Sequence, residues 1–123
     1  MYEQEGYDLM AAAFEVYNTL GYGFLEEVYQ DALEVELERR GIEYQSQPLL
    51  NVYYKNFKLN KYYRPDLFVS QVIVVELKAI PSITSVEEAQ LLNYLKATGK
   101  AVGYLINWGN SNKLEWKRYV YNS

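Results

Sequence analysis

The sequence contains no cysteine and no histidine, and these two absences exclude several classes of site. Without cysteine there are no disulfides, thiol nucleophiles or thiolate zinc sites. Without histidine there is no imidazole general base, no Ser-His-Asp triad and no His-ligated metal. Any catalysis must therefore use carboxylates, lysine, hydroxyls, amides or a hard, oxygen-binding metal ion such as Mg²⁺.

The sequence also has no hydrophobic run long enough to span a membrane, and its first ten residues lack the basic start of a signal peptide. Half of the residues are hydrophobic, and no repeat, low-complexity tract or linker interrupts them. A chain of this length can bury one core without disulfides. We therefore expect a single domain over residues 1–123, a cytoplasmic location and no membrane partner.

The charged residues are divided unevenly along the chain, whose net charge is −4. Residues 1–51 contain eleven Asp and Glu but two Arg, a balance of −9. Residues 52–123 contain five Asp and Glu and ten Lys and Arg, a balance of +5. One interpretation is a basic face for an anionic polymer. The other is an acidic helical surface beside a lysine-bearing sheet, with no such partner.

Hydrophobic spacing predicts two helices in the acidic half. The first ends at the Gly-Tyr-Gly sequence of residues 21–23, and the second runs from about Phe24 to Arg40. The second helix has a broad apolar arc, with Glu26 at its edge and Glu36 inside it.

Strand-like sequence follows these helices. Residues 44–55 and 57–69 are rich in β-branched and aromatic residues and flank a tight turn near Asn56. Residues 72–80 are almost continuously apolar, which predicts a central strand covered on both faces.

The rest of the chain predicts one more helix and two more strands. The helix covers residues 85–99, with Ser85 as N-cap and Gly99 as its end, and the strands cover residues 101–107 and 113–121. The expected order is α-α-β-β-β-α-β-β. Its β-α-β step predicts a right-handed crossover between parallel strands.

Three charged residues interrupt the most hydrophobic part of the chain, residues 64–80: Asp66, Glu76 and Lys78. A charge in a buried strand must be paired, hydrogen-bonded or bound to a metal. Glu76 and Lys78 share a strand face, and a short turn brings Asp66 alongside them. The two carboxylates would repel unless a cation lies between them, which favours Mg²⁺. The alternative is a structural ion pair, either Glu76–Lys78 or Asp66–Arg64.

Three residues outside these strands add polar and aromatic groups. Glu26 lies at the edge of an apolar arc, where an unpaired carboxylate is unfavourable, although it could simply cap its helix. Gln90 and Tyr94 are four residues apart and share a helix face, and Tyr94 could equally belong to the core.

Several of these motifs resemble those of a known group of enzymes. The PD-(D/E)XK nuclease-like superfamily has a similar signature, matched here by Pro65-Asp66 and Glu76-Leu77-Lys78. The GxxExxY family of small prokaryotic proteins has a motif matched by Gly23, Glu26 and Tyr29. The resemblance covers residues 6–120 approximately. It implies a restriction-endonuclease-like α/β (α+β) fold, with an αβββαβ core, a mixed sheet flanked by helices, an extra N-terminal helix and a C-terminal strand.

The resemblance also implies metal-dependent cleavage of phosphodiester bonds in DNA. Asp66 and Glu76 would ligate Mg²⁺ or Mn²⁺, with the carbonyl of Leu77 assisting. Lys78 would position the attacking water, and Glu26 would complete the metal shell.

Gln90 and Tyr94 are similar to a Q-x-x-x-Y element of RecB-like exonucleases that borders the active site and contacts substrate. Glu36 also fits the family pattern, without a chemical role, and a buried pairing with an arginine is one interpretation.

Binding of DNA requires cations, because the phosphate backbone dominates affinity. The expected nucleic-acid-binding residues are Tyr94, Arg64, Lys55, Lys58, Lys96 and Lys100. Fourteen tyrosines exceed what a core needs, and exposed ones suit either stacking on unpaired bases or a protein interface, including a homodimer or larger assembly. The alternative function, favoured by the acidic net charge, is a non-catalytic nucleic-acid-binding or protein-interaction module that retains the nuclease fold.

Overall fold

The computed structural model describes residues 1–122. It confirms the predicted fold class, a mixed sheet flanked by helices. The elements are α1 (Glu3–Leu20), α2 (Glu26–Arg39), β1 (Tyr44–Ser46), β2 (Leu50–Tyr54), β3 (Phe57–Tyr63), β4 (Leu67–Val69), β5 (Ile73–Lys78), α3 (Ser85–Thr98), β6 (Val102–Asn107) and β7 (Glu115–Val120). No helix within the described residues is long and apolar enough to cross a lipid bilayer.

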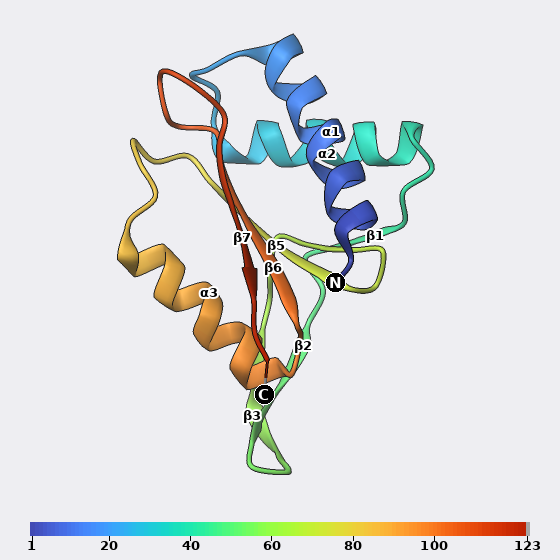
Figure 1. Ribbon diagram of the computed structural model, residues 1–123, viewed down its shortest axis with the longest axis vertical. Coiled ribbons are helices and arrows are strands. Elements are labelled where there is room, and N and C mark those ends of the chain that lie inside the picture. Colours follow the sequence, from blue (N-terminus) through green and yellow to red (C-terminus); the bar gives the residue numbers. More distant parts are fainter. Residues whose placement is uncertain (123) are drawn as a thin grey trace.

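Strand β5 occupies the centre of a five-stranded sheet with the order β1-β4-β5-β6-β7 (Figure 1). It pairs antiparallel with β4 and parallel with β6, and α3 connects the two parallel strands. The predicted central strand and its parallel neighbour are therefore confirmed. This arrangement explains why residues 72–80 are almost continuously apolar, since a central strand is covered on both faces.

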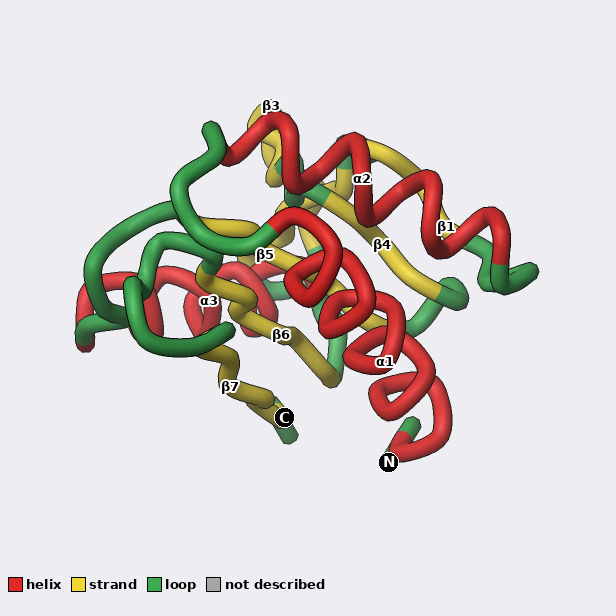
Figure 2. The backbone as a smooth tube through the Cα atoms, turned by 90° about the horizontal axis from the view of Figure 1, so that it is seen from above, coloured by secondary structure: helices red, strands yellow, loops and turns green. Residues whose placement is uncertain are grey.

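The sheet lies between two helical layers, with α1 and α2 on one face and α3 on the other (Figure 2). Successive residues of β5 pack alternately into the two hydrophobic cores on opposite faces of the sheet. Val75 and Leu77 pack in the core formed with α1 and α2, whereas Val74 packs in the core formed with α3. All three are fully buried, and each such side chain contributes about 1.5–3 kcal/mol.

The predicted tight turn near Asn56 is confirmed, but the two long strands predicted on either side of it are each divided. Residues 44–69 form four strands, of which β2 and β3 make a separate two-stranded sheet while β1 and β4 pair with each other in the main sheet. The breaks fall at Pro48 and Pro65, where a residue without an N–H cannot continue a ladder. The αβββαβ core is thus α2-β1-β4-β5-α3-β6, and the β2–β3 hairpin is an insertion between β1 and β4.

The hairpin extends away from α1 and α2, beside the C-terminal end of α3 (Figure 1). Its inner side packs on that helix, because Leu50, Val52 and Tyr63 join the core that contains Leu91 and Leu95 of α3. The hairpin is therefore anchored by side chains, whereas the main sheet is held together by backbone hydrogen bonds.

Helix α3 ends at Gly99 as predicted, where the backbone turns to a φ of 75° that favours glycine. The predicted N-cap was wrong by one residue. Thr84, not Ser85, accepts the backbone N–H of Val86, and the Glu87 carboxylate completes a capping box.

Helix α2 begins at Glu26 and buries a narrower face than its sequence predicts. Leu25 and Val35 are 68% and 58% exposed, so the broad apolar arc was wrong at its edges. Glu36 forms an ion pair with Arg40 one turn later, with Arg40 Nε 2.7 Å from Glu36 Oε2. Arg40 is exposed and Glu36 is only half-buried, so the pair contributes little and is not the buried pairing considered from the sequence.

Candidate active site

The pairing of β4 with β5 places two of the predicted metal ligands opposite each other. Leu67 lies opposite Val75 in the antiparallel register, so the next pair along the strands is Asp66 and Glu76. The backbone N–H of Leu77 donates to Asp66 Oδ2 at 2.7 Å. This hydrogen bond fixes the Asp66 side chain against β5 at the point where β4 begins.

A second set of hydrogen bonds holds the backbone of Asp66. Its carbonyl accepts from Gln30 Nε2 of α2 at 2.9 Å and from the N–H of Gln47 at 3.0 Å. Gln30 is buried and also donates to Glu34 at 3.1 Å. Gln30 was not predicted as a site residue. The available signal in the sequence was an amide on the buried side of α2, directly after Tyr29 of the GxxExxY-like motif.

Glu76 is held from the opposite side by an aromatic pair. The hydroxyl of Tyr63, the last residue of β3, donates to Glu76 Oε1. Tyr63 is buried, and its ring stacks on Tyr94 of α3 with centroids 3.8 Å apart. Tyr94 therefore reaches the site through Tyr63, which is absent from the predicted site although it lies three residues before Asp66.

The site concentrates negative charge that its own groups do not fully balance. Burial, together with the carboxylates of Asp66 and Glu26, raises the pKa of Glu76 to about 7, against the opposing effects of the Tyr63 hydrogen bond and Lys78. Burial also raises the pKa of Asp66, against the opposing effects of the Leu77 N–H and Lys78.

Glu26 belongs to the same electrostatic cluster, although it remains open to solvent at the start of α2. Partial desolvation and the charge of Asp66 raise its pKa, and Lys78 lowers it. Each of the three carboxyl groups thus responds to Lys78. The structure brings together Glu26, Asp66, Glu76 and Lys78 from α2, the start of β4 and β5.

The structural ion pairs considered from the sequence are not formed. Within residues 1–122, no salt bridge shorter than 4.0 Å joins Lys78 to Glu76 or Arg64 to Asp66. Lys78 therefore influences the carboxylates through space without neutralising either of them by direct contact.

The donor set fits a hard divalent cation, with one restriction. The described part of the chain contains no group of three or more acidic residues arranged to hold a metal. Any cation would therefore be held by the carboxylates of Asp66 and Glu76, completed by a backbone carbonyl and water, which is a set that Mg²⁺ accepts. The raised pKa of Glu76 fits this assignment, because a cation would relieve the repulsion from Asp66 and Glu26 that causes part of the shift.

The other predicted site residues lie outside this cluster. Gln90 is exposed on α3 and lines a shallow pocket with Tyr94, and no hydrogen bond joins it to the four clustered residues in the described chain. Arg64 is exposed beside the site. The four predicted DNA-binding lysines lie on or beside the hairpin and the C-terminal end of α3: Lys55, Lys58, Lys96 and Lys100.

Comparison with known proteins bears on the fold and the family of the chain. A solved structure titled "Crystal structure of SSO0001" is similar at a TM-score of 0.58 and 18% identity, and the match covers 97% of this chain and 59% of that one. The likeness concerns the fold alone, and this chain spans about three fifths of that protein. No curated protein matches the chain. The model of the PD-(D/E)XK nuclease superfamily matches residues 3–119, and the chain therefore belongs to that superfamily.

Proposed function

We propose that this protein is a metal-dependent nuclease that hydrolyses phosphodiester bonds of DNA, and that it belongs to the GxxExxY group of its superfamily. The observation that carries the proposal is the clustering of Asp66, Glu76 and Lys78 at the superfamily signature without a neutralising ion pair. Half-buried carboxylates with raised pKa values and one nearby lysine are typical of functional sites rather than of structural pairs.

Each residue has a role that its contacts support. Asp66 uses one carboxylate oxygen for the Leu77 N–H, and its other oxygen would hold the cation together with Glu76. Tyr63 orients the Glu76 side chain through its hydroxyl. When bound, Mg²⁺ or Mn²⁺ supplies positive charge that polarises a phosphoryl oxygen.

Lys78 is suited to the chemical step. Its ammonium donates hydrogen bonds and carries a charge that can orient an attacking water and stabilise negative charge developing on the phosphate. Glu26 would complete the set from α2, either through water on the cation or by accepting a proton, and partial desolvation together with the charge of Asp66 raises its pKa.

The rival function is a non-catalytic module that retains the fold. Its specific support is that Asp66 and Glu76 each already accept a hydrogen bond, from the Leu77 N–H and the Tyr63 hydroxyl. Such bonds partly stabilise the charged forms without a metal. The two functions differ in one observable: a nuclease requires a bound cation and Lys78 for DNA cleavage, whereas a non-catalytic module cleaves no DNA.

The deciding experiment is a cleavage assay with Mg²⁺ or Mn²⁺ on linear, circular, single-stranded and branched DNA, with EDTA as the negative condition. Wild-type protein should cleave at least one form, and Asp66→Asn and Lys78→Ala should abolish that cleavage. Lys113→Ala, which removes an exposed lysine in the connection before β7, is the matched control and should keep the wild-type rate. Cleavage at the wild-type rate by Lys78→Ala would refute the proposal, as would wild-type protein that is inactive on every form.

A further inference from the structure

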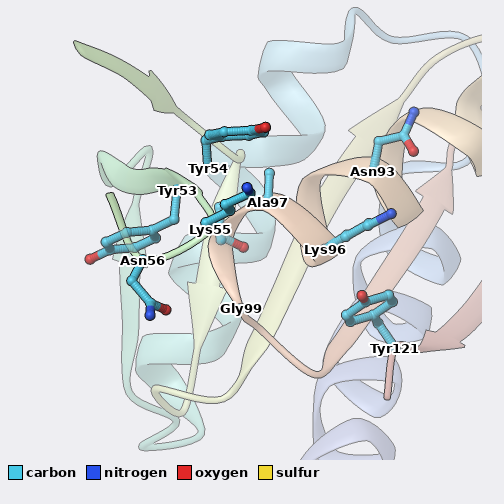
Figure 3. A pocket seen from close by; sticks show the side chains of 10 residues that line it. Tyr53, Tyr54, Lys55, Asn56, Asn93, Lys96, Ala97, Gly99 and Tyr121 are labelled. Carbon is cyan, nitrogen blue, oxygen red and sulfur yellow. The ribbon is translucent and has the colours of Figure 1, made fainter. Parts of the chain in front are cut away.

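The hairpin and the second half of α3 line an open cavity away from the carboxylate cluster. Its volume is about 790 Å³, within the range of roughly 300–1,000 Å³ that small-molecule sites occupy. Figure 3 shows side chains of the hairpin facing those of α3 across it. Among the described residues, the lining contains two lysines and no acidic side chain, and its main side chains are Tyr53, Tyr54, Lys55, Asn93, Lys96 and Tyr121.

The surroundings of this cavity are the most basic part of an acidic chain. Residues 50–65 contain four Lys and Arg and no Asp or Glu. Residues 89–100 contain two Lys and also no Asp or Glu. Half of the twelve cations therefore lie in these two segments, although the chain as a whole has a net charge of −4. Such a local concentration attracts a polyanion despite the overall charge.

Exposed aromatic rings accompany these cations on the hairpin. Tyr54 and Tyr62 are 63% and 52% exposed, and each has a lysine ammonium 5.6 Å from its ring centroid, from Lys55 and Lys58 respectively. Lys55 occupies the hairpin turn with a φ of 55°, a conformation that glycine or asparagine adopts more easily. The turn therefore presents a cation at its tip in spite of an unfavourable backbone geometry.

We propose that this surface, the hairpin platform (residues 53–58 of the hairpin with residues 93–99 and Tyr121), binds single-stranded DNA. An unpaired base stacks on Tyr53 or Tyr54, and flanking phosphates pair with Lys55 and Lys96. Sequence-tolerant binding of single strands uses this combination of aromatic faces and a basic groove. The inference rests on the proposed nuclease function, because it names the substrate form that the site receives.

The composition of the surface favours a single strand over a duplex. The faces of duplex bases are covered by stacking, so exposed tyrosines gain contact only with unpaired bases. A duplex also needs many phosphate contacts from a broad basic surface, whereas residues 1–51 carry a balance of −9.

A continuous set of side chains leads from the hairpin platform to the carboxylates. Asn93 lines both the platform cavity and the shallow pocket of Gln90 and Tyr94. The Tyr94 ring stacks on Tyr63, whose hydroxyl binds Glu76. A strand held on the platform can therefore follow the exposed face of α3 to the site.

The test is fluorescence anisotropy in EDTA, with a labelled single-stranded oligonucleotide, its duplex and an RNA of the same sequence. Tyr54→Ala should weaken binding of the single strand about 5- to 150-fold, the range typical of losing one base stack. Tyr7→Ala removes a tyrosine that is 73% exposed on α1 and should leave affinity unchanged. Lys55→Asn keeps a residue suited to the turn, and it should reduce the salt slope by about 0.7, as Lys96→Ala should.

Two results would overturn the inference: equal or tighter binding of the duplex or RNA, or single-strand affinity that is insensitive to Tyr54→Ala, to Lys55→Asn and to Lys96→Ala. The binding assay needs no cleavage, so the two proposals fail separately. A protein that binds single-stranded DNA through these residues but never cleaves refutes the nuclease alone. A protein that cleaves duplex DNA and ignores single strands refutes the platform alone.

Discussion

Removing the charge of Glu76 should stabilise the metal-free protein at neutral and alkaline pH. The pKa of Glu76 is raised to about 7 in the folded chain, from an ordinary value of 4.5. The folded state therefore binds this proton more tightly than the unfolded chain does. Stability from the protonated form is fully present below pH 4.5 and is lost as the pH rises through 7.

The size of the effect follows from the difference between these two pKa values. At about 1.4 kcal/mol for each pH unit, ionisation of Glu76 lowers the free energy of unfolding by about 3 kcal/mol. This is a large share of the ~5–15 kcal/mol that stabilises a typical domain. Asp66 and Glu26 also have raised pKa values, so they reinforce the same trend.

Urea unfolding in EDTA at pH values between about 5 and 8 measures this loss. Wild-type stability should fall across that interval, whereas Glu76→Gln should fall much less and be the more stable protein at the alkaline end. The amide oxygen of the variant can still accept the Tyr63 hydroxyl, so the substitution removes mainly the charge. Glu27→Gln, on the exposed side of α2, is the matched control and should follow the wild type.

A strongly destabilising effect of Glu76→Gln at the alkaline end would refute this reasoning. It would mean that the charged form of Glu76 is needed as a structural partner, as the rival function supposes. Addition of Mg²⁺ at that pH should restore wild-type stability and leave the variant unchanged, because a ligand bound only by the native state stabilises it.

Three further predictions concern the other residues of the site. Mg²⁺ or Mn²⁺ should raise the melting temperature of the wild type but not of Asp66→Asn in thermal unfolding, and an equal rise in both would exclude Asp66 as a ligand. Tyr63→Phe removes a hydrogen bond that lowers the pKa of Glu76, so the acid limb of the pH–rate profile should move to higher pH. If the acid limb does not move, the ionisation of Glu76 does not cause it. Lys78→Ala should reduce cleavage at least ~100-fold with single-strand affinity nearly intact, because the charge acts mainly in the transition state, and a parallel loss of affinity would assign Lys78 to binding.

The sequence predicted the core of the fold because its signals there are local. The apolar run of residues 72–80 and the glycine at position 99 each determine an element without reference to a distant partner. The one-residue error at Ser85 has a local cause as well, since Thr84 and Ser85 are both good N-caps and the Glu87 side chain selects the first.

The turn of the hairpin was predicted, but its separation from the main sheet was not. Strand propensity is high throughout residues 44–69, and whether a strand joins the main sheet depends on its pairing partner rather than on its own composition. Pro48 and Pro65 were the available signals, because each removes a backbone donor at a break between sheets. A hairpin bounded by two prolines is a more economical interpretation than two long strands.

The residues of the candidate site were likewise predicted only in part. Its charged members were predicted, because carboxylates and a lysine in a buried strand stand out in any sequence. Gln30 and Tyr63, which hold Asp66 and Glu76, were not predicted, because an amide on a helix and a tyrosine in a strand are common and acquire meaning only through tertiary contacts. Composition reveals the groups that could carry chemistry, and the fold reveals those that position them.

The hairpin insertion places part of the proposed binding surface on a different sheet from the predicted metal ligands. Asp66 and Glu76 need a fixed register between β4 and β5, and that register is set by backbone hydrogen bonds of the main sheet. Within residues 1–122 the hairpin pairs only with itself, so lysines and exposed tyrosines can accumulate on it without disturbing the register. The two parts still communicate, because β3 ends at Tyr63, and Tyr63 lies three residues from Asp66 and bonds directly to Glu76. The polar link between the proposed binding surface and the carboxylates therefore runs through one hydroxyl.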